Sequence, residues 1–135
     1  MLKVKNKIVF MLAFTLISCN QNTTIFQKVS DNEDIFSSWA MCSSASNGIL
    51  TQMNTCPIVT FTNNGMGYIT SNTLITESFK WALKKKNMKI TYSKQYSNTT
   101  FTDTNYYAEF TKEKDVINLL LRHHGNEYYL SRFAK

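Results

Sequence analysis

The chain has 135 residues, and its 15 Lys and Arg outnumber its 9 Asp and Glu, giving a formal net charge of +6. Three of these lysines lie in a segment that we expect to be removed, which leaves +3 on residues 19–135, the size of one small domain. A charge of +3 offers no basic stripe, so we do not expect nucleic-acid binding.

The first 18 residues have the pattern of a secretion signal. Lys3, Lys5 and Lys7 form a positive start, residues 8–17 are apolar except for Thr15, and no acidic residue precedes Asp31. A permanent transmembrane helix needs about 20 apolar residues, roughly twice the length of this run. A buried N-terminal helix is the alternative, but three lysines at one end favour export.

The residues that end this segment, Leu16-Ile17-Ser18-Cys19, resemble the lipobox of bacterial lipoproteins. The resemblance implies that the signal peptide, residues 1–18, is removed and that Cys19 carries the lipid. Several acyl chains anchor a protein stably in a membrane, whereas one chain does so only marginally. We therefore expect a lipid-anchored product whose membrane contact is the lipid on Cys19.

Residues 19–34 are mostly polar and predict a flexible tether between the lipid and a domain over residues 35–135. Asn20 is not the aspartate that commonly retains lipoproteins in the inner membrane of enterobacteria, and no acidic cluster follows Cys19 directly. We therefore expect attachment to the outer membrane, facing the periplasm.

Two further cysteines, Cys42 and Cys56, lie in the exported part. In an oxidising compartment two such cysteines favour a disulfide over free thiols. Metal binding is the poorer alternative, because neither cysteine has a CxxC partner and the two histidines are far away in the sequence.

From Phe36 onward, apolar residues recur with the period of a strand. Alternation is clearest over 79–83, 88–92 and 117–121. Turn signals lie at residues 63–65, 86–87 and 125–126. A helix over 77–86 is the one helical alternative, and we favour a strand there. The expected run of seven or eight short strands predicts an all-β fold, a small antiparallel up-and-down barrel, because closure removes exposed strand edges.

Scattered residues over 36–133 resemble the lipocalin-like domains of small bacterial lipoproteins. They are Ser38-Trp39, the run Cys56-Pro57-x-x-Thr60-Phe61-x-x-Asn64-Gly65-x-Gly67, Phe79-x-Trp81 and Tyr128-Tyr129-Leu130-x-Arg132. In that family a tryptophan of the first strand closes one barrel end and a late arginine packs across its ring. The resemblance implies these roles for Trp39 and Arg132, and a cation–π contact is worth about 0.5–2 kcal/mol.

Little in the sequence indicates catalysis. His123 and His124 are the only histidines, and adjacent residues of a strand point to opposite faces, so we do not expect them to share a metal or a substrate. No nucleophile motif or glycine-rich phosphate loop is present. The cluster Lys84-Lys85-Lys86 is interpreted as a solvated turn. We expect neither an enzyme nor a cofactor.

Aromatic residues are the remaining candidates for a site, either as the lining of a pocket or as core. The candidate pocket residues are Tyr68, Phe79, Trp81, Tyr92, Tyr106 and Phe110, with Phe101 and Tyr128 as further aromatic candidates. One hypothesis is a carrier that holds a small hydrophobic ligand inside the barrel. The alternative is a non-enzymatic interaction module of the cell envelope with a packed core and no internal ligand.

Overall fold

The structure is a computed structural model that describes residues 30–134. The expected signal peptide, the expected lipidation site Cys19 and the rest of the expected tether up to residue 29 lie outside the described residues. The described elements are one short 3-10 helix and nine strands: η1 (Glu33–Ile35), β1 (Ser38–Ser46), β2 (Ile49–Gln52), β3 (Ile58–Phe61), β4 (Met66–Ser71), β5 (Leu74–Lys84), β6 (Asn87–Thr91), β7 (Thr104–Glu113), β8 (Val116–His123) and β9 (Asn126–Phe133).

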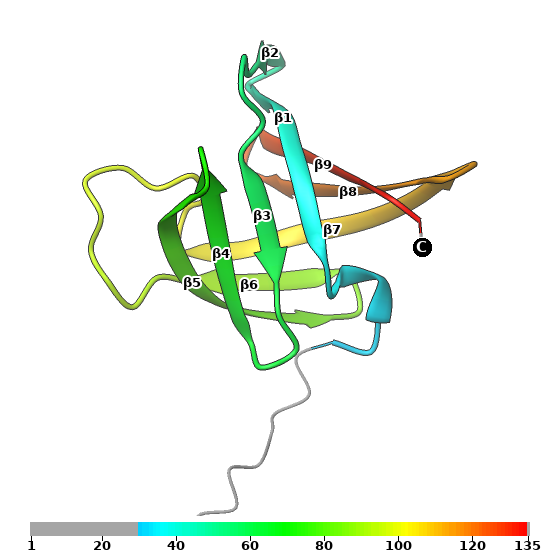
Figure 1. The fold of residues 1–135 in the computed structure, drawn as a ribbon, viewed down its shortest axis with the longest axis horizontal. Helices are drawn as coiled ribbons and strands as arrows, with labels where there is room; N and C mark the ends of the chain where they lie inside the picture. The colour runs from blue at the N-terminus through cyan, green and yellow to red at the C-terminus, as the bar shows by residue number, and fades with distance from the viewer. Residues whose placement is uncertain (1–29, 135) are drawn as a thin grey trace, which may run out of the picture.

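Eight of these strands close into an antiparallel up-and-down barrel. Strands β3 to β9 pair in chain order, and β1 joins the two ends of the series (Figure 1). Residues 38–40 of β1 pair with β3, while residues 40–46 pair with β9. The ninth strand, β2, pairs only with β1. The all-β barrel predicted from the sequence is confirmed, with β2 as an addition to it.

The strand period of the sequence determines which side chains face inward. On β5, Phe79, Trp81 and Leu83 are buried, while Lys80 and Lys84 are exposed. β8 follows the same alternation, since successive side chains of a strand point to opposite faces. The strand interpretation of residues 77–84 is therefore confirmed, and the helical alternative is wrong.

The turns lie close to the residues where the sequence predicts them. Gly65 and Gly125 take positive φ values of 83° and 77°, a conformation that glycine adopts without steric cost. The turn expected at residues 86–87 lies one residue earlier, at 85–86. One hairpin was not predicted: Asn47 and Gly48, with φ of 50° and 81°, join β1 to β2. Two central residues with positive φ are typical of a type I′ turn.

Large aromatic side chains fill the barrel interior. Phe61, Phe79 and Phe101 are almost fully buried, and the Phe79 ring contacts both of the others edge to face. Gly67 gives the Phe79 ring its space, because a Cβ at residue 67 would lie 2.2 Å from that ring. The core is therefore a set of interlocking rings rather than a hollow.

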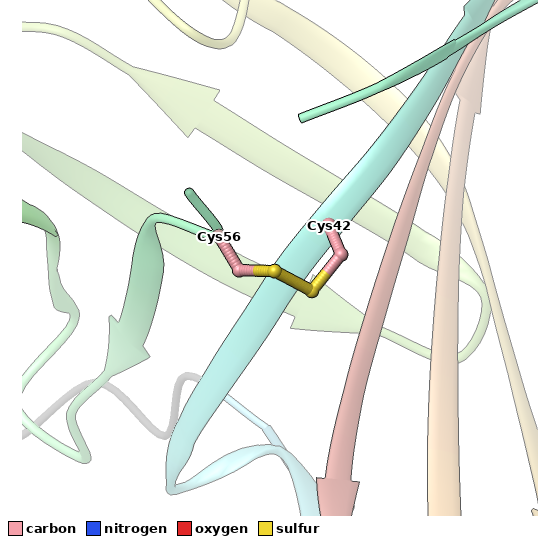
Figure 2. The surroundings of a disulfide bond; sticks show 2 residues. All are labelled: Cys42 and Cys56. Atoms are coloured by element: carbon pink, nitrogen blue, oxygen red, sulfur yellow. A yellow bond between two sulfur atoms is a disulfide. The ribbon is translucent and has the colours of Figure 1, made fainter. Parts of the chain in front are cut away.

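The disulfide between Cys42 and Cys56 connects β1 to the segment that precedes β3 (Figure 2). The Cα atoms of the two cysteines are 4.4 Å apart. This segment stays against β1: the N–H of Met53 donates to the carbonyl of Cys42 at 2.9 Å, and that of Met41 to the carbonyl of Pro57 at 3.0 Å. The predicted disulfide is confirmed, and it holds the base of β2 to the barrel.

Candidate functional site

One end of the barrel is closed by η1 and Trp39. The indole of Trp39 is fully buried, and its Nε1 donates to the carbonyl of Ile35 at 3.1 Å. The guanidinium carbon of Arg132 lies 5.0 Å from the centre of the Trp39 ring. Arg132 also donates to the carbonyl of Asp34 at 2.8 and 3.2 Å. The structure thus brings the expected closing pair together and adds η1 as its cover.

The residues before β1 belong to this cover. Ser30 is buried, and the side chain of Asn32 accepts from the N–H of Asp34 at the start of η1. Residues 30–34 were expected to be part of the tether 19–34. In the structure the folded domain begins before residue 35, because Arg132 binds Asp34.

The opposite end is covered by the loop of residues 92–103, which connects β6 to β7 (Figure 1). Phe101 of this loop is fully buried against Phe79, Tyr106 and Tyr128. The hydroxyl of Tyr106 accepts from the N–H of Thr102 at 2.7 Å. A loop residue therefore completes the aromatic interior.

A buried carboxylate fixes that loop to the barrel wall. Glu77 of β5 accepts hydrogen bonds from the Tyr92 hydroxyl at 2.7 Å and from the N–H of Thr100 at 2.9 and 3.0 Å. The Thr100 hydroxyl donates to the same carboxylate at 2.5 Å. Hydrogen bonds to a charged group are stronger than neutral ones. Glu77 is thus the polar connection between β5 and the loop 92–103.

Two tyrosines at this end of the barrel, Tyr92 and Tyr128, have raised pKa values. Burial, and next the hydrogen bond to Glu77, raise the pKa of Tyr92 above its usual range. Burial is also the main cause that raises the pKa of Tyr128 to about 12, with the neighbouring Tyr106 adding to it. Both shifts favour neutral phenols at physiological pH, so neither residue acts as a phenolate there.

The six candidate pocket residues divide into three groups. Phe79, Trp81 and Tyr106 are buried in the core, and Tyr92 and Phe110 are half-buried against it. Tyr68 lies on the outer face of β4, because its neighbours Gly67 and Ile69 face inward. The structure therefore brings five of the six together and places Tyr68 outside.

Of the six candidate pocket residues, Tyr106 alone lines any of four hollows at the surface of residues 30–134. Four hollows of about 250–700 Å³ all open on the surface, and none of the four is lined by Phe79, Trp81, Tyr92 or Phe110. The largest of the four lies between η1 and residues 60–63, beside the barrel rather than within it. Within residues 30–134, no buried side-chain nitrogen or oxygen lacks a hydrogen-bond partner.

The two histidines depart from the sequence-based expectation. His124 has a φ of 42° and lies in the turn after β8, so it does not continue the alternation of the strand. The two imidazole rings are therefore close, with centroids 4.2 Å apart, rather than on opposite faces. No cluster of three or more His, Cys, Asp or Glu side chains suited to a metal occurs among residues 30–134.

The Lys84–Lys86 cluster surrounds a surface hollow of about 400 Å³ beside Tyr107. All three lysines are exposed, as a solvated turn requires. The amino group of Lys86 donates to the Tyr107 hydroxyl at 3.2 Å, and this hydrogen bond is the main cause that raises the pKa of Lys86.

A feature that the sequence analysis missed is a long stretch without charge. Residues 35–76, which form β1 to β4 and the start of β5, contain no Asp, Glu, Lys, Arg or His. Five large aliphatic side chains within this stretch are exposed: Ile49, Leu50, Ile58, Leu74 and Ile75. A count of charges in a sliding window would have revealed the stretch.

Part of this neutral surface is a row across the outer face of the barrel. Cross-strand neighbours place Ala40, Ile58, Thr70 and Ile75 side by side on β1, β3, β4 and β5. Side chains of such pairs lie about 4.5–5.5 Å apart at Cβ. We call residues 40, 58, 70 and 75 the neutral row.

β2 extends the neutral surface beyond the barrel. Ile49 and Leu50 are 73% and 57% exposed, and no residue of β2 is buried. In Figure 1, β2 and the connection between β4 and β5 project at the same end of the barrel, away from the point where the described chain begins. This end therefore presents exposed aliphatic side chains and one strand with an unpaired edge.

Among residues 30–134, no helix is long and apolar enough to cross a bilayer. Comparison of the chain with models of known protein families, with curated proteins and with solved structures returned no match.

Proposed function

We propose that this protein is a lipid-anchored, lipocalin-like lipoprotein of the cell envelope whose barrel is a non-enzymatic interaction module. The observation that carries the proposal is a packed interior combined with an exposed neutral surface. Small-ligand sites are usually cavities of about 300–1,000 Å³. Here the inward aromatic residues contact one another instead, and the exposed aliphatic residues gather on a stretch without charge.

The lipobox-like sequence at residues 16–19 supports the lipid anchor. The proposed localisation is the outer membrane, with the barrel facing the periplasm. At about 3.5 Å per residue, the chain between Cys19 and Ser30 reaches at most about 40 Å. A chain of this length keeps the barrel near the membrane.

Acylation of Cys19 is tested by Cys19→Ala in cells fed a fatty-acid analogue with a detectable tag. The wild-type chain should take up label and run at the processed size. The variant should accumulate as unlabelled precursor, because the acceptor thiol is gone. Label that persists on the variant would refute lipidation at this residue.

The packed-core module is tested by native mass spectrometry of the full-length protein extracted gently from membranes. The expected mass is that of the acylated chain, alone or in an assembly of chains. A small hydrophobic molecule bound in stoichiometric amount would contradict the proposal and favour a carrier.

The carrier is the second candidate, and one observation favours it. Phe101, which fills one end of the interior, belongs to a loop and not to a strand. If a ligand replaces this ring, Phe101→Ala should bind an apolar fluorescent probe more tightly than the wild type. Equal, weak binding by both proteins would exclude this route into the barrel.

A further inference from the structure

β2 has one free edge, which sets it apart from the strands of the closed barrel. Its register with β1 runs from Ser46 opposite Ile49 to Ser43 opposite Gln52. In a hairpin with a two-residue turn, the pair next to the turn is hydrogen-bonded, and hydrogen-bonded pairs then alternate along the ladder. Leu50 and Gln52 therefore direct their N–H and C=O groups away from β1.

Apart from the shortness of β2, this edge lacks the features that usually protect an edge strand. Proteins commonly block such edges with charged side chains, with proline or with a covering segment. β2 reads Ile-Leu-Thr-Gln, and it pairs with no strand other than β1 among the described residues. The disulfide at its base and the tight turn at its tip hold it in an extended conformation.

The edge is complementary to itself. When two copies of β2 lie antiparallel about a two-fold axis at Thr51, Leu50 of each copy faces Gln52 of the other. These are the two residues whose backbone groups point outward, so the pairing satisfies all four groups of each strand. A two-fold interface uses the same surface on both subunits, and this edge meets that requirement.

Charge also favours a second copy over a charged partner. Because residues 35–76 carry no charge, two such surfaces approach without like-charge repulsion, and neither offers a charged partner an opposite charge. The pairing covers Ile49 and Leu50, the exposed aliphatic side chains of β2. A strand of four residues gives a small interface, but anchoring in one membrane raises the effective concentration of the two copies.

We propose that the protein forms a two-fold symmetric dimer on the membrane by antiparallel pairing of β2 with β2 of a second copy. This rests on the proposed interaction module and names its partner. Thr51 pairs with Thr51 of the second copy on the two-fold axis, and this pair is not hydrogen-bonded. In such a pair the two Cα atoms are about 4.5 Å apart. That separation is within the range of a disulfide.

The test is oxidation of cell membranes that contain the full-length Thr51→Cys variant. A species of twice the mass should form and disappear on reduction. The control is the Thr111→Cys variant. Thr111 is an exposed residue of β7 outside the charge-free stretch of residues 35–76, so this variant should stay monomeric. The same control reports any exchange with the Cys42–Cys56 disulfide.

Two further variants distinguish pairing of the two β2 strands from cross-linking by random collision of the two chains. In the Thr51→Cys background, Leu50→Pro removes an outward N–H without removing a bond to β1, and Leu50→Lys places like charges across the axis. Both should lose the dimer band. Folding is checked in each by the intact Cys42–Cys56 disulfide.

Cross-linking of Thr51→Cys no greater than that of Thr111→Cys would overturn the dimer. So would a dimer band that persists in both Leu50 variants. Neither result touches the packed-core module, which fails only if a ligand co-purifies with the protein.

Discussion

Arg132 packs its guanidinium carbon 5.0 Å from the centre of the Trp39 ring while it hydrogen-bonds the carbonyl of Asp34. The last strand of the barrel thereby contacts both the first strand and the short helix ahead of it. Closure of the sheet is what brings these residues together, because Trp39 and Arg132 lie near opposite ends of the domain. Together with η1, this contact closes one end of the barrel.

Trp39→Ala should remove much of the stability of the domain. Replacement of a fully buried tryptophan costs about 3–5 kcal/mol, out of about 5–15 kcal/mol for a domain of this size. Urea denaturation midpoints measure the loss. Tyr68→Ala is the control, since Tyr68 lies on the outer face. Equal midpoints for the two variants would contradict the structural role of Trp39.

Trp81→Ala should cost about as much as Trp39→Ala. Trp81 is a candidate pocket residue, and a ring that faced a cavity would cost less to remove. In the structure Trp81 is buried, its Nε1 donates to the carbonyl of Met66 at 2.9 Å, and its ring meets Phe61 edge to face. A loss well below that of Trp39→Ala would indicate free space beside the ring.

The double variant Cys42→Ser/Cys56→Ser should lower the free energy of unfolding by about 3 kcal/mol, the loop-closure value for a loop of this size. Alkylation of the denatured wild type without reductant should find no free thiol at either residue. Hydrogen exchange should rise most in β2 and in the segment that leads to β3, since the disulfide holds these to β1. Two reactive thiols in the wild type would refute the pairing.

Glu77→Gln should loosen the loop 92–103 and cost about 1.5–3 kcal/mol, the value of hydrogen bonds to a charged group. Faster hydrogen exchange at Thr100 and Phe101 is the specific measurement, because their N–H groups donate to Glu77 and to the Tyr92 hydroxyl. Glu109→Gln, on a partly exposed salt bridge with Arg122, is the matched control and should leave the loop unchanged.

Stability should fall as the pH rises above about 10. The folded-state pKa values of Tyr92 and Tyr128 are raised, to about 12 for Tyr128. A raised pKa means that the unfolded chain loses the proton first, so the stabilisation is complete below pH 10 and declines as the pH approaches 12. Denaturation midpoints across this range measure the decline. Tyr128→Phe should flatten it.

The alternation of apolar residues predicted the barrel because inward and outward positions differ in hydrophobicity on most strands. The short, wholly exposed β2 has no such alternation, so only its Asn47-Gly48 turn could have indicated it. Phe101 lies in a polar loop, where the strand period says nothing about burial. The Cys42–Cys56 pairing followed from the number of cysteines, not from the fold.

The pocket hypothesis placed Tyr68 inside because the sequence does not show where a strand's inward face begins. Gly67 has no side chain to mark that face, yet it faces inward and leaves room for Phe79. Similarly, His123 and His124 were expected on opposite faces because adjacent residues of a strand alternate. The turn begins at His124, and this changes the direction of its ring.

The closure at η1 also determines how the barrel would respond to mechanical tension. A pull on the chain ahead of Ser30 reaches the contacts of Ile35 with Trp39 and of Asp34 with Arg132 before it reaches the ladder of β1. Those contacts connect the point of traction to both the first and the last strand. The force is therefore shared across the seam where the barrel closes, and β1 is not peeled from one neighbour alone.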